Sequence, residues 1–169
     1  RILSRQMAQE VLLRNIDFGV LTFNPNDREL ASLQLGQDEL VLLVAPAHAL
    51  AGRDQVTMEE MGRQSIIAHN DPSPARDRVL KLYARRRAPL NIRMSLPGLD
   101  GIKRAVETGL GVALLPRRCA QGEINRGQLV PVQVPELRSP RVMRFVYLKD
   151  GGRSRAAEAF LKVARSRKT

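Results

Sequence analysis

The fold of this chain is decided by one stretch, Gly101-Ile102-Lys103-Arg104-Ala105-Val106-Glu107-Thr108-Gly109-Leu110-Gly111-Val112-Ala113-Leu114-Leu115-Pro116. Apolar residues recur at helical spacing from Leu99 to Val106, which predicts an amphipathic helix with its apolar stripe against a core. Gly109 stands where such a helix commonly ends in the left-handed conformation. The apolar run at 111–116 then predicts a buried strand. The stretch therefore indicates a helix, a tight turn and a core strand in succession.

The same alternation of strands and helices extends from this stretch to both ends of the chain. A capping-box pattern at Thr57 and Glu60 predicts a short helix, and Ser73 followed by Pro74 predicts the start of a longer one. Pro131 indicates that its strand lies at the edge of a sheet or is broken. The predicted strands span 16–21, 30–35, 40–45, 65–68, 91–95, 111–116, 130–134 and 143–148, and the other predicted helices lie at 5–14, 99–108 and 153–166. Strands that alternate with helices favour parallel, doubly wound α/β sheets.

The charge of the chain favours an anionic partner. Its 169 residues include 28 Lys and Arg against 17 Asp and Glu, a formal net charge of +11. Such a balance favours polyanions through counterion release, although solvated arginine-rich helix faces are the simpler explanation. Both alternatives stay open for the run Arg85-Arg86-Arg87. No apolar run reaches the length of a membrane span, which predicts a chain without membrane contact.

Candidate catalytic residues are few. His48 and His69 have no carboxylate or cysteine at ligand spacing, so we expect loop histidines and no metal site. Cys119, the single cysteine, follows two arginines that could lower its pKa, but a packing role in a short helix is the simpler interpretation. Gly109-Leu110-Gly111 lies between a helix and a strand, the wrong order for a dinucleotide fingerprint. We therefore predict no enzyme activity and no cofactor.

Three loops after predicted strands carry polar groups, and ligands of open α/β sheets bind beyond the carboxyl ends of strands. Two of these loops lead into helix N-termini, whose free N–H groups favour anions. Ser73 and Asp100 could equally be plain N-caps, and Asp71 and Asp100 would repel an anion. The candidate binding residues are Thr22, Asn24, His69, Asn70, Ser73, Arg76, Leu96, Pro97, Gly98 and Leu99.

Four segments match the motifs of a known family. Residues 101–116 match the pattern ixxaVxxGxGϕaϕLP, in which ϕ is apolar, and residues 15–21 match ϕDϕGϕϕ. Residues 37–50 are similar to eelvlvvppxHpLa, and residues 154–161 to sxaaxxFl. Together these segments resemble the effector-binding domain of LysR-type transcriptional regulators across nearly the whole chain.

The resemblance implies a type 2 periplasmic-binding-protein-like α/β fold with two Rossmann-like lobes and a hinge. Lobe I would be residues 1–66 plus 145–169, and lobe II residues 67–144. A small effector, often a carboxylate, would bind in the inter-lobe cleft, which the three loops would line. The first strand and helix of the family's domain have no counterpart here, and the winged helix-turn-helix would lie upstream of this chain.

The resemblance also implies a cytoplasmic homo-dimer or tetramer that contacts DNA only through that upstream domain. A periplasmic-type solute-binding protein of the same fold is the alternative function. The sequence upstream of Arg1 would distinguish these two functions.

Overall fold

The computed structural model describes residues 2, 6–70, 72–138, 141–150 and 154–166. Residue 5, at the start of the first predicted helix, residue 153, at the start of the last, and Asp71 lie outside this range. The chain divides into two compact units. Unit 1 comprises Arg1–Gln37 and Arg141–Thr169, and unit 2 comprises Asp38–Pro140.

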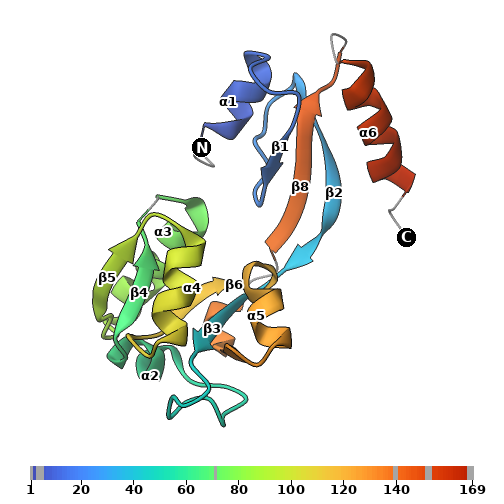
Figure 1. The fold of residues 1–169 in the computed structure, drawn as a ribbon. Helices are drawn as coiled ribbons and strands as arrows, with labels where there is room; N and C mark the ends of the chain where they lie inside the picture. Colours follow the sequence, from blue (N-terminus) through green and yellow to red (C-terminus); the bar gives the residue numbers. More distant parts are fainter. Residues whose placement is uncertain (1, 3–5, 71, 139–140, 151–153, 167–169) are drawn as a thin grey trace. The chain divides into compact units, whose positions relative to one another are not determined.

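Unit 1 is a three-stranded sheet with one helix against each face (Figure 1). Its elements are α1 (Met7–Leu12), β1 (Gly19–Leu21), β2 (Leu30–Asp38), β8 (Arg141–Leu148) and α6 (Arg155–Ser166). β8 is the middle strand and runs antiparallel to β1, with Gly19 opposite Val146. Val146 packs with Val11 of α1, whereas Phe145 on the other face packs with Leu161 of α6. Because successive side chains of β8 point to opposite faces of the sheet, the strand contributes to two small cores.

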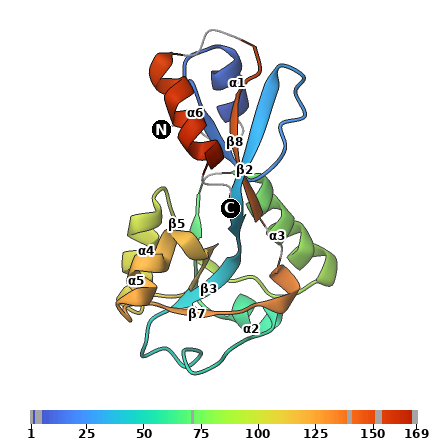
Figure 2. The ribbon, with the colours of Figure 1, turned by 90° about the vertical axis from the view of Figure 1, so that its right-hand side faces the viewer.

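Unit 2 contains the remaining elements. They are β3 (Leu40–Val44), α2 (Met58–Arg63), β4 (Ile66–His69), α3 (Pro74–Arg86), β5 (Ile92–Leu96), α4 (Leu99–Glu107), β6 (Ala113–Pro116), the 3-10 turn η1 (Arg117–Ala120), α5 (Gln121–Asn125), β7 (Val130–Val132) and the 3-10 turn η2 (Pro135–Leu137). β3 lies between β6 and β7, and β7 is seen beside β3 in Figure 2. β4 and β5 form a parallel pair, and an isolated parallel bridge joins Ile66 of β4 to Val112 beside β6.

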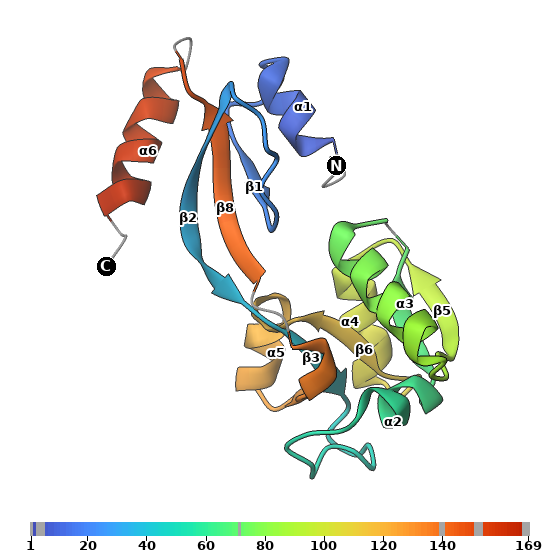
Figure 3. The ribbon, with the colours of Figure 1, turned by 180° about the vertical axis from the view of Figure 1, so that it is seen from behind.

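The continuous apolar run of β3 is explained by helices on both faces of its sheet. Leu42 and Val44 belong to a core cluster that includes Tyr83 of α3, whereas Val41 and Leu43 belong to a cluster that includes the apolar stripe of α4. α3 and α4 lie on opposite sides of the β4–β5 pair (Figure 3). A strand buried on both faces needs apolar residues at every position, as predicted for this segment.

Two predictions about the architecture differ from the structure. β3 pairs antiparallel with both β6 and β7, and β1 pairs antiparallel with β8, whereas the pair of β4 and β5 and the bridge between Ile66 and Val112 have the predicted parallel direction. The predicted lobe boundary after residue 66 also differs, because residues 38–66 belong to unit 2. The reason is that β3 forms its hydrogen bonds with β6 and β7, and that Met58 and Met61 of α2 lie in the core of unit 2. The second boundary lies after residue 140 instead of residue 144.

The predicted helix caps, the glycine after α4 and the edge strand with Pro131 are confirmed. Thr57 and Glu60 form a reciprocal capping box at the start of α2, and Ser73 caps α3. Gly109 follows α4 with φ +77°, a conformation that glycine adopts without a steric cost. β7, which contains Pro131, is an edge strand. None of the described helices is long and apolar enough to cross a membrane.

Candidate functional site

Two of the three predicted loops lie side by side at one edge of unit 2. His69 at the end of β4 is the register partner of Leu96 at the end of β5. The backbone N–H of Asn70 donates to the carbonyl oxygen of Leu96 at 3.0 Å, which holds the two strand ends together. Because β4 and β5 are parallel, both loops leave from the same edge, which we call the β4–β5 edge. One loop enters α3 and the other enters α4.

The N-terminus of α3 is largely satisfied by its own residues. Ser73 Oγ accepts a hydrogen bond from the backbone N–H of Arg76 at 3.2 Å, and Pro74 has no N–H to offer. The guanidinium of Arg76 donates to the carbonyl oxygen of Asn70 at 3.1 Å. That acceptor is neutral, so the arginine holds its positive charge at the β4–β5 edge. Ser73 is thus an N-cap, and its hydroxyl hydrogen can still be donated to a ligand.

The N-terminus of α4 is more open. Its N-cap is Gly98, which has no side chain to accept from the first N–H groups, and the first intrahelical bond runs from Ile102 to Gly98 at 3.2 Å. The N–H groups of Leu99, Asp100 and Gly101 therefore have no partner within the helix. Such groups attract anions. Leu96 and Leu99 pack against the α4 core cluster and position this turn.

Lys103 changes the charge of this helix end, and the sequence reasoning missed it. Its ammonium contacts the carboxylates of Glu123 at 2.7 Å and Asp100 at 3.1 Å. The hydrogen bond with Glu123 is the main cause that raises the pKa of Lys103 and lowers the pKa of Glu123. Asp100, expected to repel an anion, thus shares this one cation with Glu123, which is the nearer partner. The i, i+3 spacing of Asp100 and Lys103 was a signal that could have found the contact.

Thr22 and Asn24 belong to unit 1, after β1. Thr22 is half-buried, and its Oγ1 accepts from the guanidinium of Arg141 at 3.4 Å, whereas Asn24 is exposed. Arg141 begins β8 and is a second candidate that the sequence reasoning missed, because it is distant from Thr22 along the chain. Pro97 is exposed beside Gly98. The structure thus groups eight of the ten predicted residues at the β4–β5 edge and leaves Thr22 and Asn24 in the other unit.

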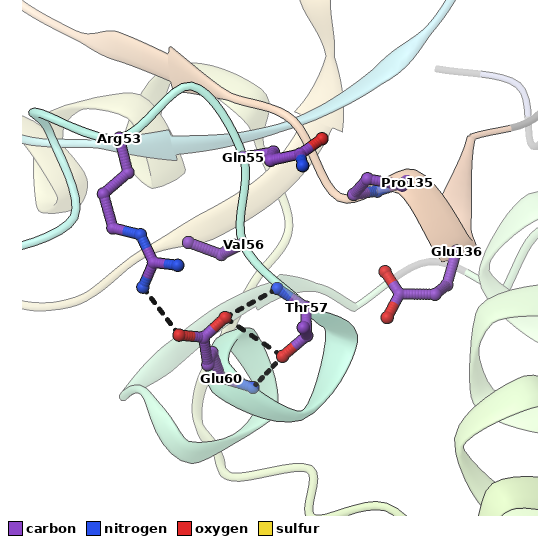
Figure 4. A pocket seen from close by; sticks show the side chains of 7 residues that line it. All are labelled: Arg53, Gln55, Val56, Thr57, Glu60, Pro135 and Glu136. Atoms are coloured by element: carbon purple, nitrogen blue, oxygen red, sulfur yellow. Dashed lines mark hydrogen bonds and ion pairs between the residues drawn. The ribbon is translucent and has the colours of Figure 1, made fainter.

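A pocket of about 210 Å³ lies elsewhere in unit 2, at the start of α2 (Figure 4). Its lining residues are Arg53, Gln55, Val56, Thr57, Glu60, Pro135 and Glu136. Glu60 there accepts from the Thr57 N–H at 2.8 Å and from Arg53 at 2.6 Å, and these bonds lower the pKa of its carboxyl to about 2. Arg53, Thr57 and Glu60 satisfy one another around the helix cap, whereas Oε2 of Glu136, which also lines the pocket, is buried without a hydrogen-bond partner among the described residues.

His48 and Cys119, which were considered for catalysis, lie in a turn and in a 3-10 turn respectively. Nδ1 of His48 accepts from the backbone N–H of Leu50 at 3.2 Å within a turn. Cys119 is half-buried in η1. Among the described residues, no group of three His, Cys, Asp or Glu side chains could hold a metal ion.

Two units of strands and helices, with strand-end loops that enter helix N-termini, define a domain with the type 2 periplasmic-binding-protein-like α/β fold. The chain belongs to the LysR substrate binding domain family, which matches residues 2–169. It is 32% identical over 144 residues to the HTH-type transcriptional regulator YeiE of Escherichia coli strain K12, covering 85% of this chain and 48% of that protein. It is also 22% identical over 160 residues to the RuBisCO operon transcriptional regulator of Allochromatium vinosum, covering 94% and 53% respectively.

Solved structures show the same fold. The regulatory domain of Synechocystis PCC6803 CcmR in complex with 2-PG has a TM-score of 0.82 and 20% identity, covering 97% of this chain and 79% of that one. The effector binding domain of QuiR in complex with shikimate has a TM-score of 0.77 and 20% identity, covering 96% and 77% respectively. The chain spans about half the length of the curated relatives that it matches.

Proposed function

We propose that this chain is the ligand-sensing part of a LysR-type transcriptional regulator and that its effector is a small anion, most simply a carboxylate. The observation that carries the proposal is the open N-terminus of α4, where Gly98 provides no side-chain cap. Membership of the LysR substrate binding domain family supports the ligand-sensing role. Two neighbours of the same fold are described with small molecules, 2-PG and shikimate.

The donors at the β4–β5 edge suit a planar carboxylate. The N–H groups of α4 would bind one oxygen, while Ser73 Oγ and the guanidinium of Arg76 would bind the other. We further propose that Thr22 and Arg141 of unit 1 contact the same effector, which would then favour one arrangement of the two units by its differential contacts. His69 and Asn70 would provide additional polar contacts, and Asn24 and Pro97 would lie at the rim.

Calorimetric titration of the chain with small carboxylates and with their neutral amides tests the charge of the effector. We expect an acid to bind and its amide to bind at least tenfold more weakly, because the amide lacks the charge that the helix N-terminus and Arg76 attract. Arg76→Ala and Ser73→Ala should each lower the affinity of the chain for the acid. Arg118→Ala, an exposed arginine in η1, is the matched control. Equal affinity of acid and amide, or unchanged affinity in both variants, would contradict the proposal.

The remaining proposals concern the longer protein. We propose that sequence-specific DNA reading belongs to a winged helix-turn-helix outside these residues, that the protein acts as a homo-dimer or tetramer, and that it works in the cytoplasm, where bacterial DNA lies. We also propose that the chain changes a DNA-binding equilibrium and catalyses no reaction. A solute-binding protein of the same fold is the second candidate, and a helix-turn-helix encoded directly upstream would exclude it.

A further inference from the structure

The pocket at the start of α2 contains a carboxylate with one oxygen that no described residue satisfies. Glu136, in η2, is half-buried, and its Oε1 accepts from the backbone N–H of Met58 at 3.3 Å. Its Oε2 is buried and accepts no hydrogen bond from the described part of the chain. A buried acceptor without a donor costs free energy, and the cost is larger when the acceptor is charged. A donor supplied by a ligand would therefore be stabilised at this oxygen.

The pocket lining carries one negative charge that is not compensated. Arg53 contacts Glu60 at 2.6 Å, so these two opposite charges offset each other. Among the described residues, no cation forms an ion pair with Glu136, the third charged group of the lining. The charge of Glu136 also acts on buried Tyr83, because it contributes, after burial, to raising the pKa of that hydroxyl to about 12. A positively charged ligand would balance the lining.

The pocket is preformed by two chain segments that are bonded to each other. The backbone N–H of Val56 donates to the carbonyl oxygen of Gln133 at 2.9 Å. Val56 is buried and lines the pocket together with Pro135, so part of the wall is apolar. In Figure 4 the side chain of Glu136 extends toward the start of α2, and the amide of Gln55 points toward Pro135. The site thus combines an apolar wall with two groups that can accept hydrogen bonds.

We propose that this pocket binds a small organic cation with a primary ammonium or guanidinium group. Its N–H groups would donate to Glu136 Oε2 and to the amide oxygen of Gln55, and its carbon atoms would contact Val56 and Pro135. The pocket volume of about 210 Å³ exceeds the roughly 10–15 Å³ that one water needs, and it is below the roughly 300–1,000 Å³ of pockets for drug-sized ligands.

A metal ion fits this pocket less well than an organic cation. Calcium takes about six to eight oxygen ligands, whereas the pocket lining offers one carboxylate that is not already paired. The proposed site is separate from the β4–β5 edge, and it does not depend on the anionic effector proposed there.

A nuclear magnetic resonance titration of the isotope-labelled chain tests the charge and the place of the ligand. The probes are n-propylguanidinium and N-propylurea, which has nearly the same shape without the charge, each at millimolar concentration and constant ionic strength. We expect n-propylguanidinium to give saturable shifts of the backbone amide signals of Val56, Thr57 and Met58. N-propylurea should bind at least tenfold more weakly, because a charged donor strengthens a hydrogen bond to a carboxylate.

Variants of the lining test the role of Glu136. Glu136→Gln removes the charge but keeps an oxygen for the N–H of Met58, and it should bind n-propylguanidinium at least tenfold more weakly. Glu59→Gln is the matched control and should retain the affinity, since Glu59 is exposed in the first turn of α2 and does not line the pocket. Gln55→Glu adds a second carboxylate to the lining and should bind about threefold more tightly.

The dispersion of the amide signals shows whether each variant is folded. Equal affinity for the two probes, or no saturable shift at the start of α2, would overturn the proposal. Unchanged affinity in folded Glu136→Gln would overturn it as well. Should Glu136→Gln not fold, unchanged affinity in Gln55→Glu would have the same meaning.

Discussion

At the residue scale, Gly111 holds β4 and β6 together through its small size. The N–H of Val112 donates to the carbonyl oxygen of Ser65 at 2.9 Å, and the N–H of Ile67 donates to the carbonyl oxygen of Val112 at 2.8 Å. A Cβ atom on Gly111 would collide with the carbonyl oxygen of Ser65. The glycine is therefore required for close approach of two backbones, in contrast to Gly109, whose positive φ is the reason for its type.

We predict that Gly111→Ala destabilises the chain by about 1–3 kcal/mol, because a methyl group is forced into a packed backbone contact. Gly52→Ala is the control, since a Cβ there meets no atom within 4 Å. Urea denaturation followed by circular dichroism would measure both. Equal stability of the two variants would show that the backbones can separate without cost.

At the scale of elements, the capping box makes the stability of α2 dependent on pH. The pKa of Glu60 is lowered from 4.5 to about 2, first by the hydrogen bond from the backbone of Thr57 and then by that from Arg53. A depressed folded pKa means that the charged form stabilises the fold above about pH 4.5. This contribution is lost as the pH falls from about 4.5 through about 2.

We predict that Glu60→Gln reduces this acid sensitivity. The amide preserves a neutral capping box but does not titrate, so the free energies of unfolding of variant and unsubstituted chain should converge as the pH falls from 4.5 to 2. Denaturation at a series of pH values measures this. Glu59→Gln, also in the first turn of α2, is the control. It should leave the pH dependence of the free energy of unfolding unchanged.

The ion pair between α4 and α5 gives a second prediction for elements. Lys103 and Glu123 have side chains that are 12% and 17% exposed, so water screens them less than a surface pair. A double-mutant cycle with Lys103→Met and Glu123→Gln should give a coupling free energy of about 1 kcal/mol. The pair of Arg126 and Glu123, at 4.0 Å with the arginine 62% exposed, should give a value near zero. Equal coupling in the two cycles would contradict the role of burial.

Structural features that depend on residues close together in the sequence were predicted correctly. The caps of α2 and α3 and the end of α4 each depend on a few consecutive residues. The parallel direction predicted for β3 was wrong, because its partners lie far along the chain and an apolar run is equally suited to either direction. The contacts Thr22–Arg141 and Lys103–Glu123 were missed for the same reason. The candidate loops were therefore predicted without these two side-chain contacts.

At the scale of the whole molecule, β5 presents an edge that pairs only with β4 in the described part of the chain. Ile92 and Met94 on this strand are 36% and 39% exposed. An exposed apolar edge strand commonly pairs with another chain. This is a physical reason to expect the homo-dimer that the family resemblance implies.

We predict that sedimentation equilibrium finds a concentration-dependent dimer and that Met94→Lys shifts it toward monomer, because a buried charge would oppose pairing. Leu110→Lys, an exposed apolar position after α4, is the control and should leave the association constant unchanged. A monomer at every concentration would exclude this arrangement for the chain.

The position of β8 in the middle of its sheet has a consequence for synthesis of the protein on the ribosome. Unit 2 is one continuous segment, 38–140, and all of it leaves the ribosome before β8 does. β1 and β2 emerge first but have no middle strand between them until β8 arrives. We therefore expect unit 2 to fold during translation while the early strands of unit 1 wait, exposed to chaperones and proteases, for the end of the chain.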